Sequence, residues 1–319
     1  MVYSRDLERE KTKGGLKLPK RISSGLGLVV VFTLGFYLAY KASQLYQYQA
    51  VFAGSYTYQL LFTSFSWLIP VSILGGIFAG AASEREQSQI IDGQVLRHDG
   101  LAFLIHWSHA IATLLLVVTG VYLGFLFIPR LVFTPQSVGY MLNLHFVGVV
   151  VLLFSVSCHL TDLLLAGKLK EHWPEAGDFK AALAHYAAKV GIGTAPPEGK
   201  YLASEKLSYP LWVLSVGLVI LTGLTKISAH VWNLPGGLME VATLLHDIGA
   251  LLVILNLAAH IFFSSLVPWS RPLLRSMLTG YVSEEYVRKN HPKWYAELSG
   301  QPLRKTDSTE KGSQLPFSS

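Results

Sequence analysis

The chain has 319 residues, of which 51% are hydrophobic and 14% are charged. Soluble domains carry about 25% charged residues, so this composition excludes an ordinary soluble globular protein and indicates an integral membrane protein. The net charge of +6 comes from basic residues gathered in a few segments, which is typical of membrane topology, and no nucleic-acid partner is expected.

Six apolar stretches approach the length that a bilayer requires, about 20 residues for a helix across the hydrocarbon core. Backbone polar groups in lipid must be paired within their own segment, so each stretch is expected to be an α-helix. The predicted fold class is therefore an all-α integral membrane protein with about six transmembrane helices. In chain order, the predicted spans are roughly 25–42, 58–82, 101–128, 142–165, 209–227 and 244–267.

Lysine and arginine are distributed unevenly between the two sides of these spans. Residues 1–24, the loops after the second and fourth spans and the tail after residue 267 together hold 23 of the 26 basic residues. The other three are Lys41, Arg130 and Lys226. Cytoplasmic loops are enriched in Lys and Arg, so we expect a multi-pass protein with both termini in the cytoplasm.

The two N-terminal spans have features of their own. The basic start and apolar centre of the first also fit a signal peptide, whose cleavage would place the new N-terminus outside. We expect this span to be retained as a signal anchor, because no small-x-small cleavage site precedes Lys41. The second span contains Gly76 and Gly80, a spacing that favours close helix packing.

Two spans carry the same histidine pattern, 101 positions apart. A Leu-His-x-x-Gly motif contains His145 and is followed by His159, and a second contains His246 and is followed by His260. The fourteen residues between the histidines of each pair make about four helical turns, or about 21 Å, which places one imidazole near each side of the bilayer. Intramembrane histidines are costly, so two matched pairs favour two stacked b-type haems over simple packing. The glycine of each motif would leave room for porphyrin, and the single Cys158 excludes covalent haem attachment.

The repeat also includes the spans before these. Thr119-Gly120 and Thr222-Gly223 occupy matching positions in the third and fifth spans. We therefore expect two related hairpins in one four-helix haem-binding bundle. The predicted organisation is a basic cytoplasmic N-terminus at 1–24, two additional helices at 25–95, a dihaem domain at 96–298 and a disordered cytoplasmic tail at 299–319.

The histidines can be paired in only one way on the outer side, but in more than one way on the cytoplasmic side. On the outer side only His145 and His246 lie within spans, so they pair by elimination. On the cytoplasmic side His106, His159 and His260 compete. The repeat alone favours His159 with His260.

Five short motifs between residues 96 and 298 bear on this choice. They are Leu96-Arg97-His98, His106-Trp107, Thr119-Gly120, Gly199-Lys200-Tyr201 and Asn290-His291-Pro292-Lys293-Trp294-Tyr295. The segment that contains them resembles the formate dehydrogenase gamma subunit, a membrane cytochrome b of the bacterial b561-like superfamily. The histidine pattern also recurs in hydrogenase and thiosulfate reductase cytochromes, whereas the tail motif is more specific for the formate dehydrogenase branch.

The resemblance implies a set of iron ligands. In that family the histidine of the His-Trp pair binds the cytoplasmic-side haem, which favours His106 with His260 and leaves His159 as the alternative ligand. His145 and His246 then hold the other haem.

The resemblance also implies a quinone pocket just before the fifth span, where the family has Gly-Lys-Tyr-Asn-x-Gly-Gln-Lys. In this chain Leu202, Ser204 and Glu205 replace the Asn, Gly and Gln. Tyr201 and Glu205 are expected beside the quinone, with Glu205 as a proton carrier. Alternatively, Glu205 is an acidic residue in the first turn of a helix, where the helix dipole favours negative charge.

These features together predict a membrane-anchor dihaem cytochrome b subunit of a formate dehydrogenase-like respiratory enzyme. By resemblance, its partners are an iron–sulfur subunit and a molybdenum or tungsten catalytic subunit on the periplasmic side, and electrons cross the membrane to quinone. By the same resemblance, the chain is expected to lie in the bacterial inner membrane and to have no substrate-oxidising site of its own. Alternatives are the cytochrome of a hydrogenase or of a thiosulfate or polysulfide reductase, and a transporter that relays protons through intramembrane histidines.

The loop after the fourth span contains an amphipathic segment at 178–189, which is expected to lie as a helix on the membrane surface. His109 is expected beside the cytoplasmic-side haem, and His230 lies in the short outer loop. The histidines of the cytoplasmic segments are expected to be solvated: His98, His172, His185 and His291.

Overall fold

Five helices long and apolar enough to cross a membrane occur in the computed structural model, which describes residues 20–53, 61–229 and 232–301. They are Lys20–Gln44, Gly100–Leu123, Pro135–Leu165, Ala203–Ser228 and Gly236–Leu266. The predicted all-α integral membrane fold is confirmed. The predictions for 1–19, for 302–319 and for His230 lie outside the described residues.

The predicted second span differs in its details. It contains two helices, α3 (Leu61–Ser64) and α4 (Leu68–Ala82), separated by a short break. Pro70 lies in the first turn of α4, and its ring would clash with a helix that continued from α3. The 15 residues of α4 make about 22 Å, which is less than the roughly 30 Å of a hydrocarbon core. Among the described residues, five helices are long enough to cross a membrane, and α3 and α4 together occupy the described part of the predicted second span.

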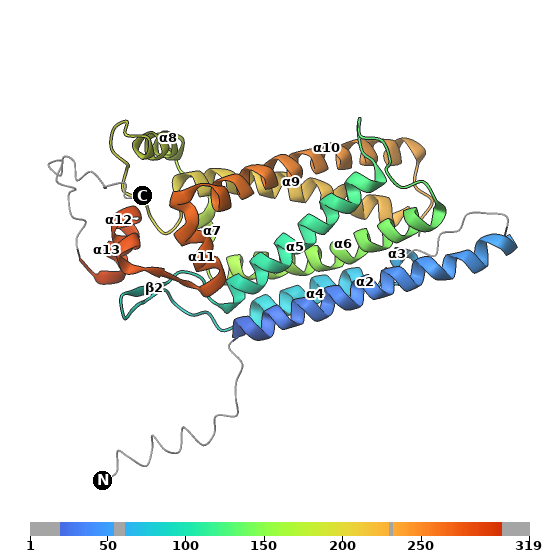
Figure 1. Cartoon of the computed structure of the whole chain (residues 1–319), viewed down its shortest axis with the longest axis horizontal. Helices are drawn as coiled ribbons and strands as arrows, with labels where there is room; N and C mark the ends of the chain where they lie inside the picture. Colours follow the sequence, from blue (N-terminus) through green and yellow to red (C-terminus); the bar gives the residue numbers. More distant parts are fainter. Residues whose placement is uncertain (1–19, 54–60, 230–231, 302–319) are drawn as a thin grey trace, which may run out of the picture.

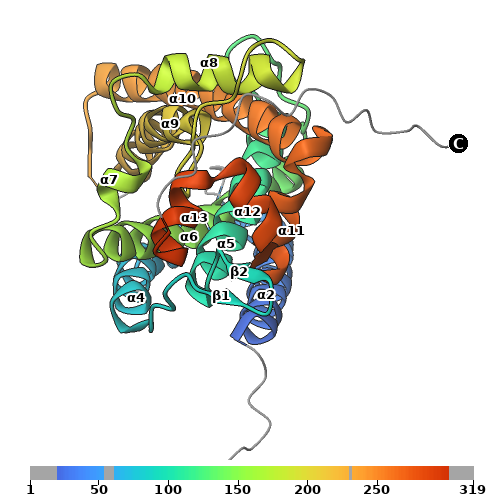
Figure 2. The same ribbon diagram turned by 90° about the vertical axis from the view of Figure 1, so that its left-hand side faces the viewer.

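The long helices form three layers that run along the long axis of the molecule (Figures 1 and 2). The middle layer is α5 (Gly100–Leu123) with α6 (Pro135–Leu165), one side layer is α2 (Lys20–Ala53) with α4, and the other is α9 (Ala203–Ser228) with α10 (Gly236–Ile261). α6 is the most buried span, because α2, α4 and α5 all pack on it. The α9–α10 hairpin packs on itself and meets α5 over a short stretch only.

Small residues bring α4 and α6 close together, as the sequence predicts. A Cβ atom at Gly80 would lie 2.6 Å from the carbonyl oxygen of Cys158, and one at Gly76 would meet the carbonyl oxygen of Phe154. Any larger side chain would push the two helices apart. Cys158 is fully buried at this contact, as expected of a small apolar residue.

One end of the bundle is covered by short elements, which we call the cap (Figure 1). It contains α7 (Leu169–His172), α8 (Asp178–Lys189), α11 (Arg271–Thr279), α12 (Glu284–Asn290), α13 (Pro292–Ser299) and the strands β1 (Ile90–Ile91), β2 (Gln94–Leu96) and β3 (Tyr281–Ser283). A π-helical turn (Phe262–Leu266) and a 3-10 turn (Pro268–Ser270) connect α10 to α11. α8 coincides with the amphipathic segment predicted at 178–189.

The cap has a small core of its own. The three strands pair antiparallel in the order β1-β2-β3, with Val95 opposite Val282. Val95 and Val282 pack with Val287 and Trp294 in one buried cluster. The strands are too short for a periodic pattern, so the sequence does not predict them. The pairing of β2 with β3 joins the segment that precedes α5 to the segment that follows α11.

Candidate functional site

His145 of α6 and His246 of α10 face each other near the end of the bundle opposite the cap. Their ring centroids are 6.4 Å apart, and the ring planes make an angle of 58°. The structure therefore brings together the two histidines that elimination pairs on the outer side.

A threonine holds each of these rings. Oγ1 of Thr119 lies 2.8 Å from Nδ1 of His145, and Oγ1 of Thr222 lies 3.0 Å from Nδ1 of His246. Each hydroxyl also donates its single proton to the carbonyl four residues earlier in its helix. The hydroxyl must therefore accept from Nδ1–H, which leaves Nε2 with a free lone pair. This is the tautomer that a metal-binding histidine requires.

His106 of α5 and His260 of α10 form a second pair, close to the cap. Their ring centroids are 6.2 Å apart, with ring planes at 54°. The indole of Trp212 packs edge-on against His260 at 6.3 Å. Both histidine pairs thus join α10 to the α5–α6 hairpin.

His159 lies elsewhere. Its Nε2 is 3.2 Å from the hydroxyl of Tyr209, and its ring centroid is 6.2 Å from that of His172. Among the described residues, the rings that face His260 are those of His106 and Trp212. The pairing of His159 with His260, which the repeat alone favours, is not the one seen.

Both pairs have a geometry that fits a single iron between two imidazoles. A metal–imidazole nitrogen bond is about 2 Å long, so two rings on opposite sides of one metal ion have centroids about 6 Å apart. The observed separations of 6.2 and 6.4 Å agree with this value. The donor sets therefore fit two bis-histidine haem sites, one toward each end of the bundle.

A cavity of about 1260 Å³ extends from the surface of the cap into the bundle between the two hairpins. His106 and His260 line its deep part together with His109, and Tyr201 lies in the wall near the cap. The ring centroid of His109 is 6.5 Å from that of Trp212, which also contacts His260. The role of His109 beside a haem stays a prediction.

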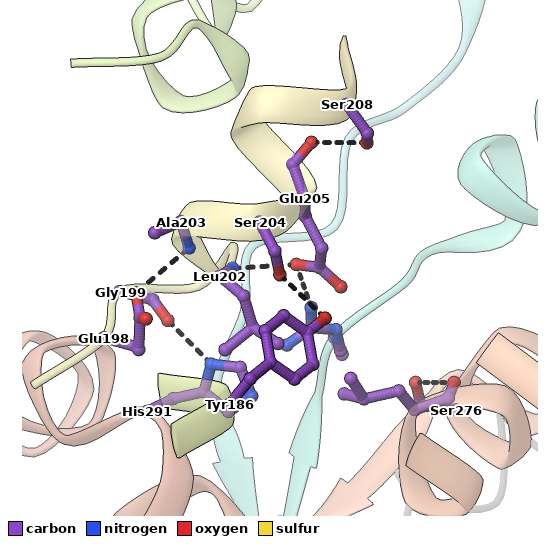
Figure 3. Close-up of polar contacts among 12 residues, drawn as sticks. Tyr186, Glu198, Gly199, Leu202, Ala203, Ser204, Glu205, Ser208, Ser276 and His291 are labelled. Carbon is purple, nitrogen blue, oxygen red and sulfur yellow. Dashed lines mark hydrogen bonds and ion pairs between the residues drawn. The ribbon is translucent and has the colours of Figure 1, made fainter. Parts of the chain in front are cut away.

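The segment before α9 is held by two carboxylates (Figure 3). Glu205 accepts a hydrogen bond from the backbone N–H of Leu202 at 2.8 Å, and Glu198 accepts one from Ala203 at 3.1 Å. Glu205 therefore has the helix-start role that was one of its two interpretations. It is not among the described residues that line the cavity, whereas Tyr201 is. Its role beside a quinone stays a prediction.

Two cations stack on aromatic rings in the cavity wall. The guanidinium of Arg97 lies 5.9 Å from the ring of Tyr201 and 5.7 Å from that of Trp294, and the ammonium of Lys200 lies at the same two distances. Burial and the neighbouring Arg97 lower the pKa of Lys200 to about 8. Burial raises the pKa of the Tyr201 hydroxyl, which thus stays protonated.

The expectation of solvated cytoplasmic histidines is wrong for His98, whose pKa is lowered by burial in the cavity wall, and for His291 and His185. His291 is fully buried and His185 is 5% exposed, because the cap encloses both. Nδ1 of His291 lies 2.7 Å from the carbonyl oxygen of Gly199, which links the tail to the segment before α9 (Figure 3). Only a folded cap explains these buried imidazoles.

The glycines of the two Leu-His-x-x-Gly motifs do not leave room for porphyrin, and that prediction is also wrong. A Cβ atom at Gly148 would lie 2.8 Å from the side chain of Leu116, and one at Gly249 would lie 2.8 Å from Val219. The neighbouring helix of each hairpin fills this space. The glycines allow α6 to approach α5 and α10 to approach α9.

Residues 97–280, more than half of the chain, match the family model of prokaryotic cytochrome b561. The chain belongs to this family. It is therefore a membrane cytochrome b, and the family implies haem b as its cofactor. The resemblance drawn from its motifs is confirmed at this level.

The chain is similar to cytochrome b556 subunits of formate dehydrogenases. The chain is 26% identical over 216 residues to the formate dehydrogenase cytochrome b556 subunit of Haemophilus influenzae, which covers 65% of the chain and 84% of that protein. Two Escherichia coli proteins match over shorter stretches. They are the nitrate-inducible formate dehydrogenase cytochrome b556(Fdn) subunit, 22% identical over 34% of the chain and 48% of that protein, and the cytochrome b556(fdo) subunit, 25% identical over 31% and 46%.

Proposed function

We propose that the chain is the dihaem membrane-anchor subunit of a formate dehydrogenase-like respiratory complex, and that it passes electrons from a periplasmic iron–sulfur subunit to quinone at the cytoplasmic face. The observation that carries this proposal is the presence of two histidine pairs of matching geometry, one toward each end of the same helices. A single site would bind one cofactor at one depth of the membrane. Two sites at different depths allow electrons to pass from one face of the membrane to the other.

In this proposal His145 and His246 hold one haem b and His106 and His260 hold the other. When bound, the haem supplies reversible one-electron oxidation and reduction at its iron. The four histidines would supply the iron ligands, and Thr119 and Thr222 keep the rings of His145 and His246 in the metal-binding tautomer.

The quinone site is proposed at the capped end, where the cavity reaches from the surface to His106 and His260. Tyr201 lines this cavity and, as a protonated phenol, can donate a hydrogen bond to a quinone oxygen. Glu205 lies at the start of α9 next to this wall, as a carrier of protons from the cytoplasm. The cap then faces the cytoplasm, and the distribution of basic residues supports that orientation.

The partners are inferred from the names of the relatives. Three of these are called cytochrome b556 subunits of formate dehydrogenase, which favours a formate-oxidising molybdenum or tungsten subunit over a hydrogenase or thiosulfate reductase partner. We place the complex in the bacterial inner membrane, with both termini of this chain in the cytoplasm.

Purification of the tagged chain with its partners tests the proposal. We expect sharp visible bands of reduced b haem, two haems per chain, and complete extraction by acid–acetone, because the chain has no Cys-x-x-Cys-His motif. Formate should reduce the haem and an added quinone analogue should reoxidise it. Reduction by hydrogen or a sulfur compound in place of formate would favour the other complexes, and a colourless protein would contradict any cytochrome function.

A further inference from the structure

Arg97 is a buried cation with unused hydrogen-bond donors. It follows β2 directly, and 2% of its side chain is exposed. Its Nη2 lies 3.4 Å from a carboxylate oxygen of Glu205, but Nε and Nη1 have no hydrogen-bond partner among the described residues. A guanidinium is always charged and prefers to have its donors paired when it is removed from water. The two remaining donors therefore indicate an anion that binds beside it.

Lys200 adds a second positive charge at the same place. Its ammonium stacks on the two rings that also contact Arg97, Tyr201 and Trp294. Its hydrogen-bond partner is the neutral hydroxyl of Ser88, 3.3 Å away. Glu205, the carboxylate in direct contact with Arg97, is 37% exposed and occupies one of the Arg97 nitrogens. Glu171 and Asp99 act on Lys200 from a longer distance, but neither forms an ion pair with it among the described residues, so both cations keep donors available for an anion.

Both cations line the cavity whose deep part is formed by His106 and His260. His98 also lines the cavity. It interacts electrostatically with Arg97 and Lys200 and also with His106, so it lies between the two cations and the histidine pair. Burial, with Arg97 next in importance, lowers the pKa of His98 to about 2, so this imidazole stays neutral and adds no further charge.

We propose that Arg97 and Lys200 bind the propionate carboxylates of the haem held between His106 and His260. This inference rests on the proposed function, because it requires a haem at that histidine pair. Haem b carries two propionates on one edge of its ring, and both are ionised at neutral pH. Arginine and lysine form short charge-assisted hydrogen bonds with carboxylates, and the aromatic rings keep both cations in place when the carboxylates are absent.

The propionates also fix how the ring is turned. Axial histidines leave a haem free to rotate about the line between them, so a second contact must set the direction of its edge. With Arg97 and Lys200 in the cavity wall at the capped end, these two side chains would hold the propionate edge of the haem toward the cap. The two cations are therefore positioning residues, distinct from the iron ligands.

Infrared difference spectroscopy of the whole purified complex tests this assignment. Cells that cannot make aminolevulinate are fed this precursor with an isotope label at its carboxyl carbon, which survives in haem only in the propionate groups. The redox difference spectrum then identifies the propionate bands by their isotope shift. Arg97→Gln and Lys200→Gln should each move labelled bands and lower the midpoint potential of the haem near the cap, because a positive charge that stabilises the reduced form is lost. Arg97→Lys should retain most of the wild-type spectrum.

Arg85→Gln is the matched control. Arg85 lines the same cavity, but it is paired with Asp162 at 2.8 Å, so its loss should leave the labelled bands unchanged. Labelled bands that stay in place in both glutamine variants, with haem retained, overturn the proposal. The same is true if those bands stay unchanged while binding of a quinone-site inhibitor weakens, which assigns the cations to quinone. If Arg97→Gln fails to accumulate, Lys200→Gln decides alone. Absence of haem at His106 and His260 in the wild-type protein is a different result, since it refutes the proposed function itself.

Discussion

The two histidine pairs share one geometry but differ in their surroundings. At the end opposite the cap, each ring is held through Nδ1 by a threonine of the neighbouring helix. Near the cap, neither His106 nor His260 has a hydrogen-bond partner among the described residues, and both line a cavity that reaches the surface. We call His145 and His246 the closed pair and His106 and His260 the open pair. The closed pair suits electron transfer alone, because both rings are held in place. The open pair, with cations nearby, suits exchange with a small molecule and with protons.

Removal of a ligand from the closed pair should have the largest effect. His246→Ala should abolish binding of the haem proposed there and leave the other in place, so the haem content falls by about half. Haem per chain is measured from the pyridine haemochrome spectrum of the purified protein. If both haems remain, the pairing of His145 with His246 is refuted.

The open pair can be tested by comparing two histidines that lie at a similar depth. His106→Ala should lose the haem near the cap, whereas His159→Ala should keep both haems, because His159 contacts Tyr209 and His172 instead of His260. Redox titration of each variant shows how many haems remain, because each haem titrates as a separate component. The reverse outcome would mean that the internal repeat, and not the pairing seen in the fold, decides ligation.

The cap around the open pair should weaken in acid. Burial, with a contribution from Arg97, lowers the pKa of His291 to about 3, whereas an unfolded histidine titrates at about 6.5. As the pH falls from about 6.5 toward 3, the unfolded cap gains a proton that the folded cap does not, so stability is lost over that range. Hydrogen exchange of α12 and α13 measures this loss. His291→Gln should flatten its pH dependence, and an unchanged slope would contradict the assignment.

Substitutions at Glu205, at the start of α9, distinguish its structural role from its proposed role as a proton carrier. Glu205→Leu removes the acceptor for the Leu202 N–H and should cost about 1 kcal/mol in stability. If Glu205 also carries protons, reoxidation of haem by quinone slows in this variant, whereas Glu205→Gln folds normally and shows an altered pH profile. Stopped-flow reoxidation at several pH values distinguishes these cases. Equal rates in all three proteins would leave Glu205 with its structural role only.

The smallest effect is expected from the hydrogen bond that distinguishes the closed pair. Thr119→Val removes the acceptor for Nδ1–H of His145, makes the imidazole a weaker donor to iron and should raise that haem's midpoint potential by a few tens of mV. Thr113→Val is the control, since Thr113 lines the cavity near the open pair and makes no such bond. An unchanged potential in Thr119→Val would show that the threonine does not tune its histidine.

Some features of the site follow from the chain alone. Apolar length and the basic loops predict a helical membrane protein, because lipid leaves the backbone no other paired arrangement. The spacing of His145, His159, His246 and His260 predicts imidazoles at two depths, because four helical turns bring a helix back to the same face. The Thr-Gly repeat predicts two related hairpins. Each of these inferences depends on local geometry only.

The choice among competing partners was decided by the tertiary structure. The repeat favours His159 as the partner of His260 and the resemblance favours His106. In the structure, the packing of α5, α6, α9 and α10 places the ring of His106 against His260 and the ring of His159 against Tyr209. The break before Pro70 and the three short strands escape detection because too few residues carry the pattern. Arg97 and Lys200 are 103 residues apart in the chain. They meet in one wall only because β2 and the segment before α9 close the same end of the bundle, where both cations pack against Tyr201 and Trp294.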